Sequence, residues 1–555
     1  MEYLKFDTQS CKDCHLCLRN CPVKAIKFVN HKPQIVSDMC ILCGHCVTKC
    51  PQNAKRVISN IDDVKGLLKD NPSKVALSVA PSFISYYDCS NFASFKNACK
   101  KLGFSVVEET ARGAYYVTKE YKKLLDSGEY PVLITSACPS TVTYLCTEFP
   151  NAIKYLAPVV SPMIAHARIL KHEHQDVKVV FVGPCIAKKK EADDSNEIEC
   201  ALTFEELDMM LKEADISFED VEDTQAYNPA RYYPINRGVI KSFGLKVSEK
   251  YDSIAVDGEE QIKEVLTNID QMENLFFEMN MCIGGCINGP IRNNEHISLR
   301  ANDIVRKYAK SSKGTQIEEN LPFDVDLSCE HKQIENKRKI PSDEEIQKIL
   351  NRIFKYDKKD EIDCGACGYN TCREKAIAVY NGMADPEFCM PYLKNKAESI
   401  SNEIIEHTPN GIITINKDGI LVDANQRAYE YLQLSKESLG NFYQDYVDLP
   451  ELMMAIYEEK NIDSIIVYND KIDKYFDVSI TIVKEHQLAF AIYKDVTQET
   501  LQDEKMRQLR KEMVEVTDKV ITKQMAAVQE IASLLGESTA EAKVALVNFR
   551  NTLKD

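Results

Sequence analysis

One stretch decides the fold of the central part of the chain, PVLITSACPSTVTYL (131–145). Its apolar run at 132–134 predicts a short buried strand, and the polar residues after the run end that strand before an apolar helix begins. Cys138 is therefore expected at the junction between a strand and a helix. A lone cysteine at such a turn is usually inert packing, so its role has to be judged together with the other cysteines among the 21 in the chain.

Composition limits the class of protein. A chain of 555 residues, 44% of them hydrophobic, is expected to form about three to five domains. A formal charge of −16 argues against nucleic acid or an anionic membrane as a partner. No apolar run approaches the ~18 residues of a membrane span, and the first ten residues, MEYLKFDTQS, lack the apolar segment of a signal peptide. We therefore expect a cytoplasmic protein whose cysteines bind metal rather than form disulfides.

Two copies of one cysteine pattern open the chain, CKDCHLCLRNCP (11–22) and CILCGHCVTKCP (40–51). C-x2-C-x2-C-x3-C-P is the bacterial ferredoxin pattern for two [4Fe–4S] clusters, in which the fourth cysteine of each run binds the other cluster. The expected ligand sets are Cys11, Cys14, Cys17 and Cys50 for one cluster, and Cys40, Cys43, Cys46 and Cys21 for the other. Zinc knuckles are the alternative, but zinc sites usually pair two C-x2-C units without the following proline. His15 and His45, inside the two runs, are expected to be surface residues.

A third cysteine group follows much later, in DCGACGYNTCREKAIAVYNGMADPEFC (363–389). The spacing C-x2-C-x4-C-x16-C resembles the small single-cluster iron–sulfur module that is appended to redox proteins. Gly365 and Gly368 allow a tight backbone around a cubane, and a helix from Arg373 returns the chain to the last cysteine. The expected ligands are Cys364, Cys367, Cys372 and Cys389, with a zinc site as the alternative.

Four further cysteines fall in three separated loops: Cys138, Cys185, Cys282 and Cys286. The first two loops follow predicted strands, which is where open α/β sheets place their ligands. Cys282 and Cys286 are four residues apart, so one helical turn is expected to direct both at one site. Taken singly, each of the four is more readily explained as a buried packing residue.

Three motifs in these loops resemble the H-cluster motifs of [FeFe]-hydrogenases: TSACP (135–139), PCIAKKKEA (184–192) and EMNMCIGGCINGP (278–290). The resemblance includes their order after a ferredoxin-like domain and spans about residues 1 to 395. It implies that the four cysteines bind a [4Fe–4S] cubane, and that Cys286 bridges this cubane to a diiron unit with carbon monoxide and cyanide ligands. It also implies that Lys188 hydrogen-bonds a cyanide. The five remaining cysteines are expected to be structural: Cys89, Cys99, Cys146, Cys200 and Cys329.

The same resemblance implies a defect next to the first motif cysteine. In fast members of the family the residue before it is a second cysteine whose thiol passes protons to the diiron cofactor, and here it is Ala137. A relay needs a group that gives and takes protons near the working pH, which a thiol can do and a methyl group cannot. Arg112 and Gly113 stand near where the family tends to carry carboxylates, although Glu108 and Glu109 are close by. We therefore predict slow turnover.

The alternative is that another proton path, through water or Glu278, compensates for Ala137. The chain also lacks the tryptophan that is usual in the first motif, since it has no tryptophan at all. In the third motif GPIRNN (289–294) replaces a glycine-rich stretch. These departures leave the cluster ligands intact.

Residues 399–500 resemble a PAS sensory domain. Their pattern reads as helix, strand, a turn at Lys417-Asp418-Gly419, strand and helix, followed by three alternating strands. His407 and His486 are expected to be surface residues, so this domain is expected to dimerise and transmit without a bound ligand.

The tail from 501 to 555 is predicted to be helical. Its apolar residues first follow the 3-4 spacing of a coiled coil, at Met506, Leu509, Met513, Val516 and Val520. The seam continues at Ile521, Met525, Val528, Ala532 and Leu535, is broken at GES (536–538), and is followed by Ala542, Leu546, Phe549 and Leu553. The expected outcome is a homodimer, and the alternative is a helix folded back on the PAS domain. The tail resembles a histidine-kinase dimerisation helix pair but has no histidine, so its output must pass to a partner.

The predicted fold is multidomain, α/β and α+β. Its expected parts are a two-cluster ferredoxin-like domain (1–60), an α/β H-cluster domain (61–340), a single-cluster module (341–398), a PAS domain (399–500) and a coiled-coil tail (501–555).

The predicted function is that of a sensory [FeFe]-hydrogenase of an anaerobe, which binds H2 and relays redox state through its clusters. Its expected partners are H2, a redox carrier such as ferredoxin, a second copy of the chain and a separate kinase or phosphatase. One alternative is an ordinary catalytic hydrogenase. The other is an iron–sulfur electron-transfer or assembly protein that never receives the diiron unit, against which Lys188 and Cys286 argue.

Overall fold

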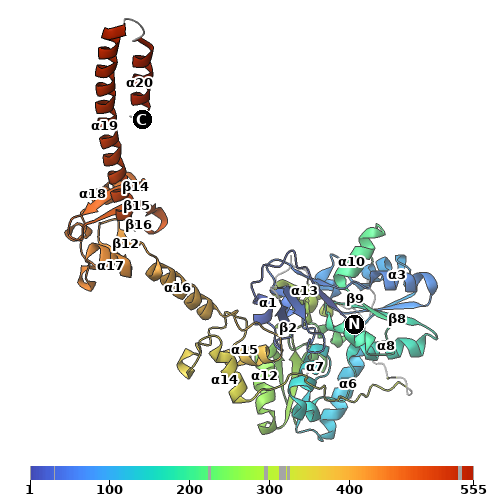
Figure 1. Cartoon of the computed structure of the whole chain (residues 1–555). Coiled ribbons are helices and arrows are strands. Elements are labelled where there is room, and N and C mark those ends of the chain that lie inside the picture. The colour runs from blue at the N-terminus through green and yellow to red at the C-terminus, as the bar shows by residue number, and fades with distance from the viewer. Residues whose placement is uncertain are drawn as a thin grey trace. The chain divides into compact units, whose positions relative to one another are not determined.

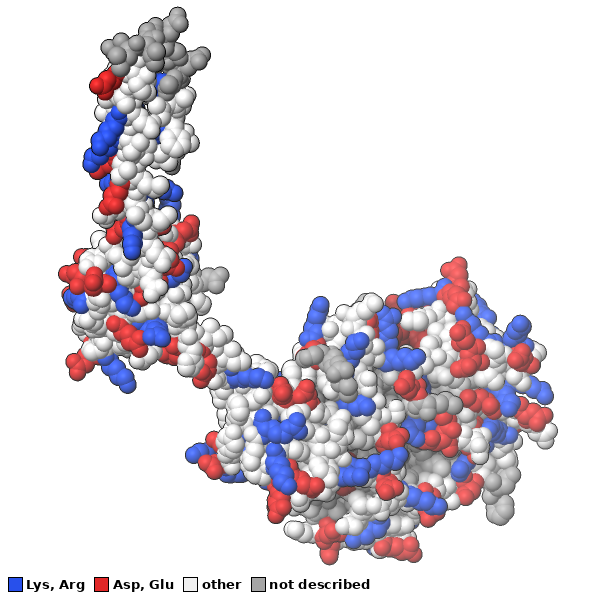
Figure 2. Space-filling model, viewed as in Figure 1, with Lys and Arg blue, Asp and Glu red and all other residues white. Residues whose placement is uncertain are grey.

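The computed structural model describes residues 2–29, 32–222, 227–244, 246–292, 298–311, 321, 325–535 and 540–553. The chain divides into two compact units, Met1–Tyr392 and Leu393–Asp555 (Figure 1). Among the described helices, none is long and apolar enough to cross a membrane. Figure 2 shows lysine and arginine side chains interspersed with aspartate and glutamate over the visible face of each unit. The four expected boundaries between the five domains stay predictions.

The first unit opens with the ferredoxin-like part, in which each cysteine run ends in a short helix followed by a strand. A two-stranded antiparallel sheet pairs β1 with β4, and a second pairs β2 with β3. The elements are β1 (Leu4–Phe6), α1 (Leu16–Arg19), β2 (Ile26–Val29), β3 (Lys32–Ile35), α2 (His45–Thr48) and β4 (Lys55–Val57). This repeated arrangement confirms the ferredoxin-like prediction.

Two parallel sheets form the centre of the first unit. One has the strand order β6-β5-β8-β9 and the other the order β10-β11-β7. Their strands are β5 (Val75–Val79), β6 (Val106–Glu109), β7 (Val132–Ile134), β8 (Lys178–Gly183), β9 (Cys200–Thr203), β10 (Asp252–Asp257) and β11 (Leu275–Asn280). Most of these strands are short apolar runs buried on both faces, as parallel sheets covered by helices require. The α/β prediction for this region is confirmed.

Helices lie around these sheets, and several begin directly after a strand (Figure 1). Those of four or more residues are α3 (Ile61–Asp70), α4 (Phe83–Tyr86), α5 (Phe92–Lys101), α6 (Ala111–Ser127), α7 (Pro139–Glu148), α8 (Pro162–Glu173), α9 (Ala187–Asp193), α10 (Phe204–Glu213), α11 (Gly238–Ser242), α12 (Glu259–Asn268) and α13 (Ser298–Ser311). Pro139 opens α7 at its first position, where the missing N–H costs nothing. The predicted junction of strand, Cys138 and helix is thereby confirmed.

The ferredoxin-like part shares a hydrophobic core with the three-stranded sheet. Val23, Ala25 and Ile41 lie in one buried cluster with Val132 and Met281, which come from β7 and from the loop after β11. Burial of this apolar surface fixes the cysteine runs against the loops that carry Cys138 and Cys282.

The single-cluster module completes the first unit with α14 (Asp343–Asn351) and α15 (Cys372–Tyr380). Ser342 and Glu345 form a capping box that satisfies the first N–H groups of α14. Ile346 and Leu350 of α14 pack against Ala376 of α15. This packing holds the helix that separates Cys372 from Cys389.

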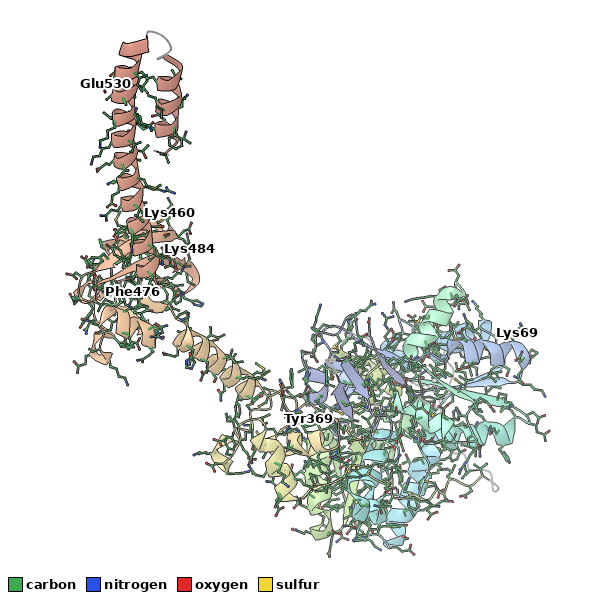
Figure 3. The ribbon with its side chains drawn as sticks, viewed as in Figure 1. Lys69, Tyr369, Lys460, Phe476, Lys484 and Glu530 are labelled. Carbon is green, nitrogen blue, oxygen red and sulfur yellow. The ribbon has the colours of Figure 1, made fainter. Side chains whose placement is uncertain are left out.

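The second unit contains a five-stranded antiparallel sheet of order β13-β12-β16-β15-β14. Its elements are α16 (Met390–His407), β12 (Gly411–Asn416), β13 (Leu421–Ala424), α17 (Gln426–Leu432), α18 (Pro450–Glu458), β14 (Ile462–Asn469), β15 (Lys474–Val483) and β16 (Leu488–Asp495). The predicted PAS order is confirmed. Phe476, labelled in Figure 3, lies in the core with Tyr443 and Tyr493. His407 and His486 are exposed, as expected.

The tail forms two helices that pack against each other, α19 (Thr497–Leu535) and α20 (Ala540–Thr552) (Figure 1). The GES segment (536–538) lies outside the described residues. Met506, Leu509, Met513, Val516 and Val520 are exposed large hydrophobic side chains of α19. The described chain therefore leaves the first half of the predicted seam uncovered, and the homodimer stays a prediction.

A buried ion pair fixes α9, the helix that carries Lys188. Lys189 Nζ lies 2.8 Å from Glu206 Oε2, and both side chains are almost fully buried. We expect Lys189→Met to lower the free energy of unfolding by about 3 kcal/mol, because it leaves the Glu206 carboxylate buried without its cation. Urea denaturation of the full chain, followed by circular dichroism, measures this change.

Lys190→Met is the matched control, because the neighbouring Lys190 pairs with Asp194 at the surface. Exposed pairs of this kind contribute at most about 1 kcal/mol. Equal effects of the two substitutions would contradict the role of the Lys189 pair.

Candidate metal-cluster sites

The three loops that carry the motif cysteines meet at the carboxyl ends of parallel strands. Cys138 follows β7, Cys185 follows β8 and Cys282 follows β11. The sequence indicated strands before two of these loops, and the structure adds β11 before the third. Since β7 and β11 are neighbours in one sheet and β8 belongs to the other, the site lies where two sheet edges meet, a usual ligand position in α/β folds.

The four motif cysteines line one cavity of about 930 Å³, part of it open to solvent. Burial raises the pKa of Cys185 to about 11, and the thiol of Cys138 adds to the shift. Burial also raises the pKa values of Cys282 and Cys286 well above their usual range, with further contributions from the other cysteines of the set. Four thiols that oppose one another's ionisation are suited to iron, whose positive charge stabilises all the thiolates together.

The segment between Cys282 and Cys286 is not a helical turn, so that expectation is wrong. Gly284 and Gly285 have φ values of 83° and 90°, a left-handed region that favours glycine. A Cβ atom on Gly285 would lie 2.5 Å from the carbonyl oxygen of Pro234. The two glycines therefore turn the chain sharply and bring both cysteines to the cavity without a helix.

Lys188 lines the same cavity from α9. Its ammonium donates to Ser161 Oγ at 2.9 Å and to Glu191 Oε2 at 2.6 Å. An ammonium has three N–H groups, so one donor remains for an anionic group in the cavity. This geometry fits the role that the sequence resemblance implies for Lys188.

The side chains in and near the cavity wall are poorly suited to carry protons. Ala137 lines the wall beside Cys138 and offers only a methyl group. Tyr233 also lines it, but burial raises the pKa of its hydroxyl well above the usual range. Burial alone would raise the pKa of Glu108, but hydrogen bonds and charges of His166 and Arg112 outweigh this effect and lower the pKa to about 2. Its neighbour Glu109 forms a buried ion pair with Arg231.

Glu278 is the group best tuned to exchange protons near neutral pH. It is fully buried on β11, and burial raises its pKa to about 7 although the N–H groups of Ile240 and Gly238 donate to it. Asn280, which lines the cavity, donates to its Oε1 at 3.3 Å. Glu278 is thus separated from the cavity by one side chain.

The eight cysteines of the ferredoxin-like part form two groups. Burial raises the pKa of Cys43, and the thiols of Cys21, Cys46 and Cys40 raise it further. Cys21 therefore lies close to cysteines of the second run, and its binding to their cluster stays a prediction.

The other group gathers around Cys17. Burial raises the pKa of Cys17 and the thiols of Cys11 and Cys14 add to the shift, whereas the charge of Lys55 opposes it. Lys55 is also close to Cys50, whose pKa falls despite burial because backbone N–H groups and Lys55 stabilise its thiolate. The charge of Lys55 also acts on the thiol of Cys46, so the sharing of one cluster by Cys50 and the first run stays a prediction.

The third group of cysteines lines a cavity of about 370 Å³. Its four members are Cys364, Cys367, Cys372 and Cys389. Two buried lysines, Lys355 and Lys375, line the same cavity. The sequence did not single out these lysines, whose charges suit the negative charge of a thiolate-bound cluster.

His15 is buried, with 6% of its surface exposed, so the expectation of a surface residue is wrong. Its ring stacks between Phe28 at 3.8 Å and Phe388 at 4.1 Å. His45 is partly buried. The single-cluster module packs on the ferredoxin-like part and covers His15, an arrangement that no local pattern indicates.

The five remaining cysteines fit a structural role. Cys99, Cys146 and Cys200 are buried, and burial raises their pKa values. Cys89 and Cys329 are partly buried. Cys329 Sγ lies 3.4 Å from His331 Nε2, a pair that the sequence spacing did not suggest.

Comparison with protein families matches four segments of the chain. Residues 73–290 match the iron only hydrogenase large subunit, C-terminal domain, and residues 3–51 match a 4Fe-4S dicluster domain. Residues 360–391 match an Fe-S cluster family, and residues 400–462 match a PAS domain. The central domain is an [FeFe]-hydrogenase domain. The chain is an [FeFe]-hydrogenase-like iron–sulfur protein that also carries a PAS domain.

Individual relatives of the hydrogenase domain are distant. Iron hydrogenase 1 of Clostridium pasteurianum is 24% identical over 45% of this chain and 63% of its own length. The NADP-reducing hydrogenase subunit HndD of Solidesulfovibrio fructosivorans is 24% identical over 46% of this chain and 56% of its own length. The chain therefore spans less than two thirds of these two relatives. A solved [FeFe]-hydrogenase of Chlamydomonas reinhardtii is 16% identical, covers 46% of this chain and 91% of its own, and has a TM-score of 0.35.

The grouping of Cys21 with the second run predicts the iron content of double variants. We expect Cys21→Ser/Cys46→Ser to lose about four iron atoms per chain, because both residues bind one cluster, and Cys21→Ser/Cys17→Ser to lose about eight. Iron and sulfide analysis after reconstitution measures this difference. If each run bound its own cluster, the two results would be exchanged.

Proposed function

We propose that this chain is a hydrogen-sensing [FeFe]-hydrogenase. It binds H2 at an H-cluster, oxidises or produces it slowly, and passes its redox state through iron–sulfur clusters to the PAS domain and the helical tail. One observation carries the proposal. The residue beside Cys138 in the cavity wall is Ala137, which leaves the H-cluster without an adjacent proton carrier.

Cleavage of H2 releases two protons and two electrons, and both must leave before the next cycle. General acid–base groups contribute roughly 10²–10⁴-fold to such proton transfers. Ala137 cannot contribute, and Glu108 is held as an anion by Arg112 and His166. A hydrogen-binding site with slow proton exchange suits detection better than bulk turnover.

The residues of this chain fit the H-cluster. The diiron unit, when bound, supplies the heterolytic cleavage of H2. Cys138, Cys185, Cys282 and Cys286 would hold the cubane, with Cys286 also bridging to the diiron unit. Lys188 keeps one N–H free to orient an anionic ligand, and Pro162, Met163 and Met281 give the cavity an apolar wall that excludes water.

The second unit provides the output. A PAS domain and a helical tail with an exposed apolar seam support signalling through a homodimer. A separate kinase or phosphatase would read the tail, and a redox carrier such as ferredoxin would exchange electrons with the clusters. Signalling of this kind requires two states of the chain that differ in their affinity for H2 or for the partner.

An ordinary catalytic hydrogenase is the second candidate, and Glu278 favours it. A carboxyl with a pKa of about 7 that is one side chain from the cavity can both give and take protons near neutral pH. In that case the PAS domain serves only to dimerise the enzyme. A third reading, an iron–sulfur protein without the diiron unit, is opposed by the position of Lys188.

Infrared spectroscopy tests the proposal on the full chain matured with the diiron cofactor, under H2 and then under inert gas. We expect carbon monoxide and cyanide bands that shift reversibly with H2, together with low turnover of the same sample. Bands with fast turnover would indicate the ordinary enzyme. No bands, under conditions that mature a control hydrogenase, would indicate an iron–sulfur protein.

Substitution at position 137 tests the reason for slow turnover. We expect Ala137→Cys to raise H2 turnover by roughly 10²-fold, because a thiol of ordinary pKa can pass protons where a methyl group cannot. Ala137→Ser is the matched control, since its hydroxyl has a similar size but does not titrate near neutral pH. Unchanged turnover in the cysteine variant, with intact infrared bands, would show that proton supply at position 137 does not limit the rate.

A further inference from the structure

The two histidines of the ferredoxin-like runs occupy positions that the sequence left without a function. His15 lies between Cys14 and Cys17, and its ring is sandwiched between Phe28 of β2 and Phe388, which precedes Cys389. Its Nδ1 lies 3.4 Å from the carbonyl oxygen of Cys367, and its Nε2 lies 3.2 Å from Asp13 Oδ1. His15 thus joins a loop of the first run to two loops of the single-cluster module.

The backbone at His15 indicates that the side chain is needed there. His15 caps α1 with a left-handed φ of 56°, and the equivalent cap of α2 is Gly44 with a φ of 74°. Glycine adopts this conformation freely, whereas a residue with a Cβ atom is strained in it. The first run therefore has a strained histidine where the second run has glycine. The stacking contacts of the His15 ring offset the cost of this backbone strain.

Other contacts make this interface a fixed one. Lys24 Nζ donates to the carbonyl oxygen of Gly368 at 3.0 Å, and the backbone N–H of Phe28 donates to that of Met383 at 3.4 Å. Leu18 and Tyr369, the latter labelled in Figure 3, are buried in one hydrophobic cluster. The single-cluster module is therefore seated on the first run.

His45 makes the corresponding contact on the other side of the ferredoxin-like part. Its ring hydrogen-bonds with the backbone of Met281 and of Asn20. Met281 precedes Cys282, so His45 joins the second run to the third H-cluster motif. Cys43 itself lines the H-cluster cavity.

Gly44, next to His45, allows the second run to lie close to the loop that contains Pro290. A Cβ atom on Gly44 would lie 2.4 Å from Pro290 Cβ, so only glycine at that position lets the second run approach the H-cluster loops.

We propose that His15 and His45 are the two joints of a linear electron path, in which the single-cluster module is the terminal station. The order is the H-cluster, the cluster of the second run, the cluster of the first run and the cluster of the module. This inference rests on the proposed function for the source of the electrons, which is H2. The order of the clusters along the path does not depend on that source. In each step one electron moves, so that the donor cluster is oxidised from the 1+ to the 2+ state while the acceptor is reduced from 2+ to 1+.

The proposal assigns the module a specific place in the chain. Its last ligand, Cys389, is followed directly by α16 (Met390–His407), the helix from which the second unit continues. An electron from the H-cluster would have to pass both ferredoxin-type clusters before it reaches this helix. His15 and His45 are positioning residues in this scheme, since they hold loops in place and bind no iron.

The test uses the full chain with reconstituted clusters and exchanges each histidine for the residue at the equivalent position of the other run. His15→Gly copies Gly44 and relieves the backbone, and His45→Leu copies Leu16. Iron analysis first establishes that each variant keeps its clusters. Electron paramagnetic resonance of dithionite-reduced protein then reports magnetic coupling between clusters, and this readout requires no hydrogenase activity.

We expect His15→Gly to abolish the coupling between the module cluster and its neighbour while the coupling between the two ferredoxin-type clusters persists. In protein matured with the diiron unit, H2-driven reduction of the module cluster should slow roughly tenfold, with that of the other two unchanged. His45→Leu should leave all coupling outside the H-cluster intact and slow the reduction of all three clusters.

Unchanged coupling and unchanged reduction rates in an iron-complete His15→Gly variant would overturn the proposal. If that variant loses iron, Phe28→Leu provides the second test, because it removes one of the two stacking rings, replaces no iron ligand and should weaken the same coupling. A chain that shows no infrared bands refutes the proposed function, yet the dithionite measurements still decide the order of the stations.

Discussion

Four thiols that line one cavity, Cys138, Cys185, Cys282 and Cys286, are the constraint on which the first unit depends. Their loops follow strands of two different parallel sheets, so the cavity exists only when both sheets are folded and correctly placed. Burial and mutual repulsion raise the pKa values of Cys185, Cys282 and Cys286. Binding of iron reverses this cost, which couples cluster insertion to the stability of the whole domain.

The packing of the two ferredoxin-like cysteine runs depends on single residues in each run. The second run approaches the H-cluster loops because Gly44 has no side chain, and the first run accepts the module because His15 fills the equivalent position. The two runs therefore contact different parts of the first unit, and the residues at their equivalent positions, Gly44 and His15, fit these different contacts. Buried lysines near the first run and near the module supply positive charge where thiolates are concentrated.

The first unit has several groups of cysteines suited to electron transfer but few side chains suited to proton transfer near the cavity. Cys43 of the second run lines the H-cluster cavity, and Cys17 of the first run shares a hydrophobic cluster with Cys367 of the module, whereas Ala137 offers no proton carrier beside Cys138. Glu108 and Glu109 are held in ion pairs, whereas burial raises the pKa of Glu278 to about 7. Slow proton exchange beside a series of clusters is what the proposed redox sensor requires, and in that proposal the PAS domain passes the signal to a partner.

The sequence by itself determined that iron–sulfur, hydrogenase-like and PAS segments are present, and it determined the PAS strand order, because cysteine spacing and strand alternation are local properties of the chain. It also determined that Cys138, Cys185, Cys282 and Cys286 belong to one site, through motifs whose order is specific. Tertiary structure alone decided the surroundings of His15, which local pattern placed at the surface. It also decided the two-glycine turn before Cys286 and the capture of Glu108 by Arg112. These features depend on contacts between segments far apart in sequence, such as Phe28 with Phe388, and no periodicity within either segment encodes them.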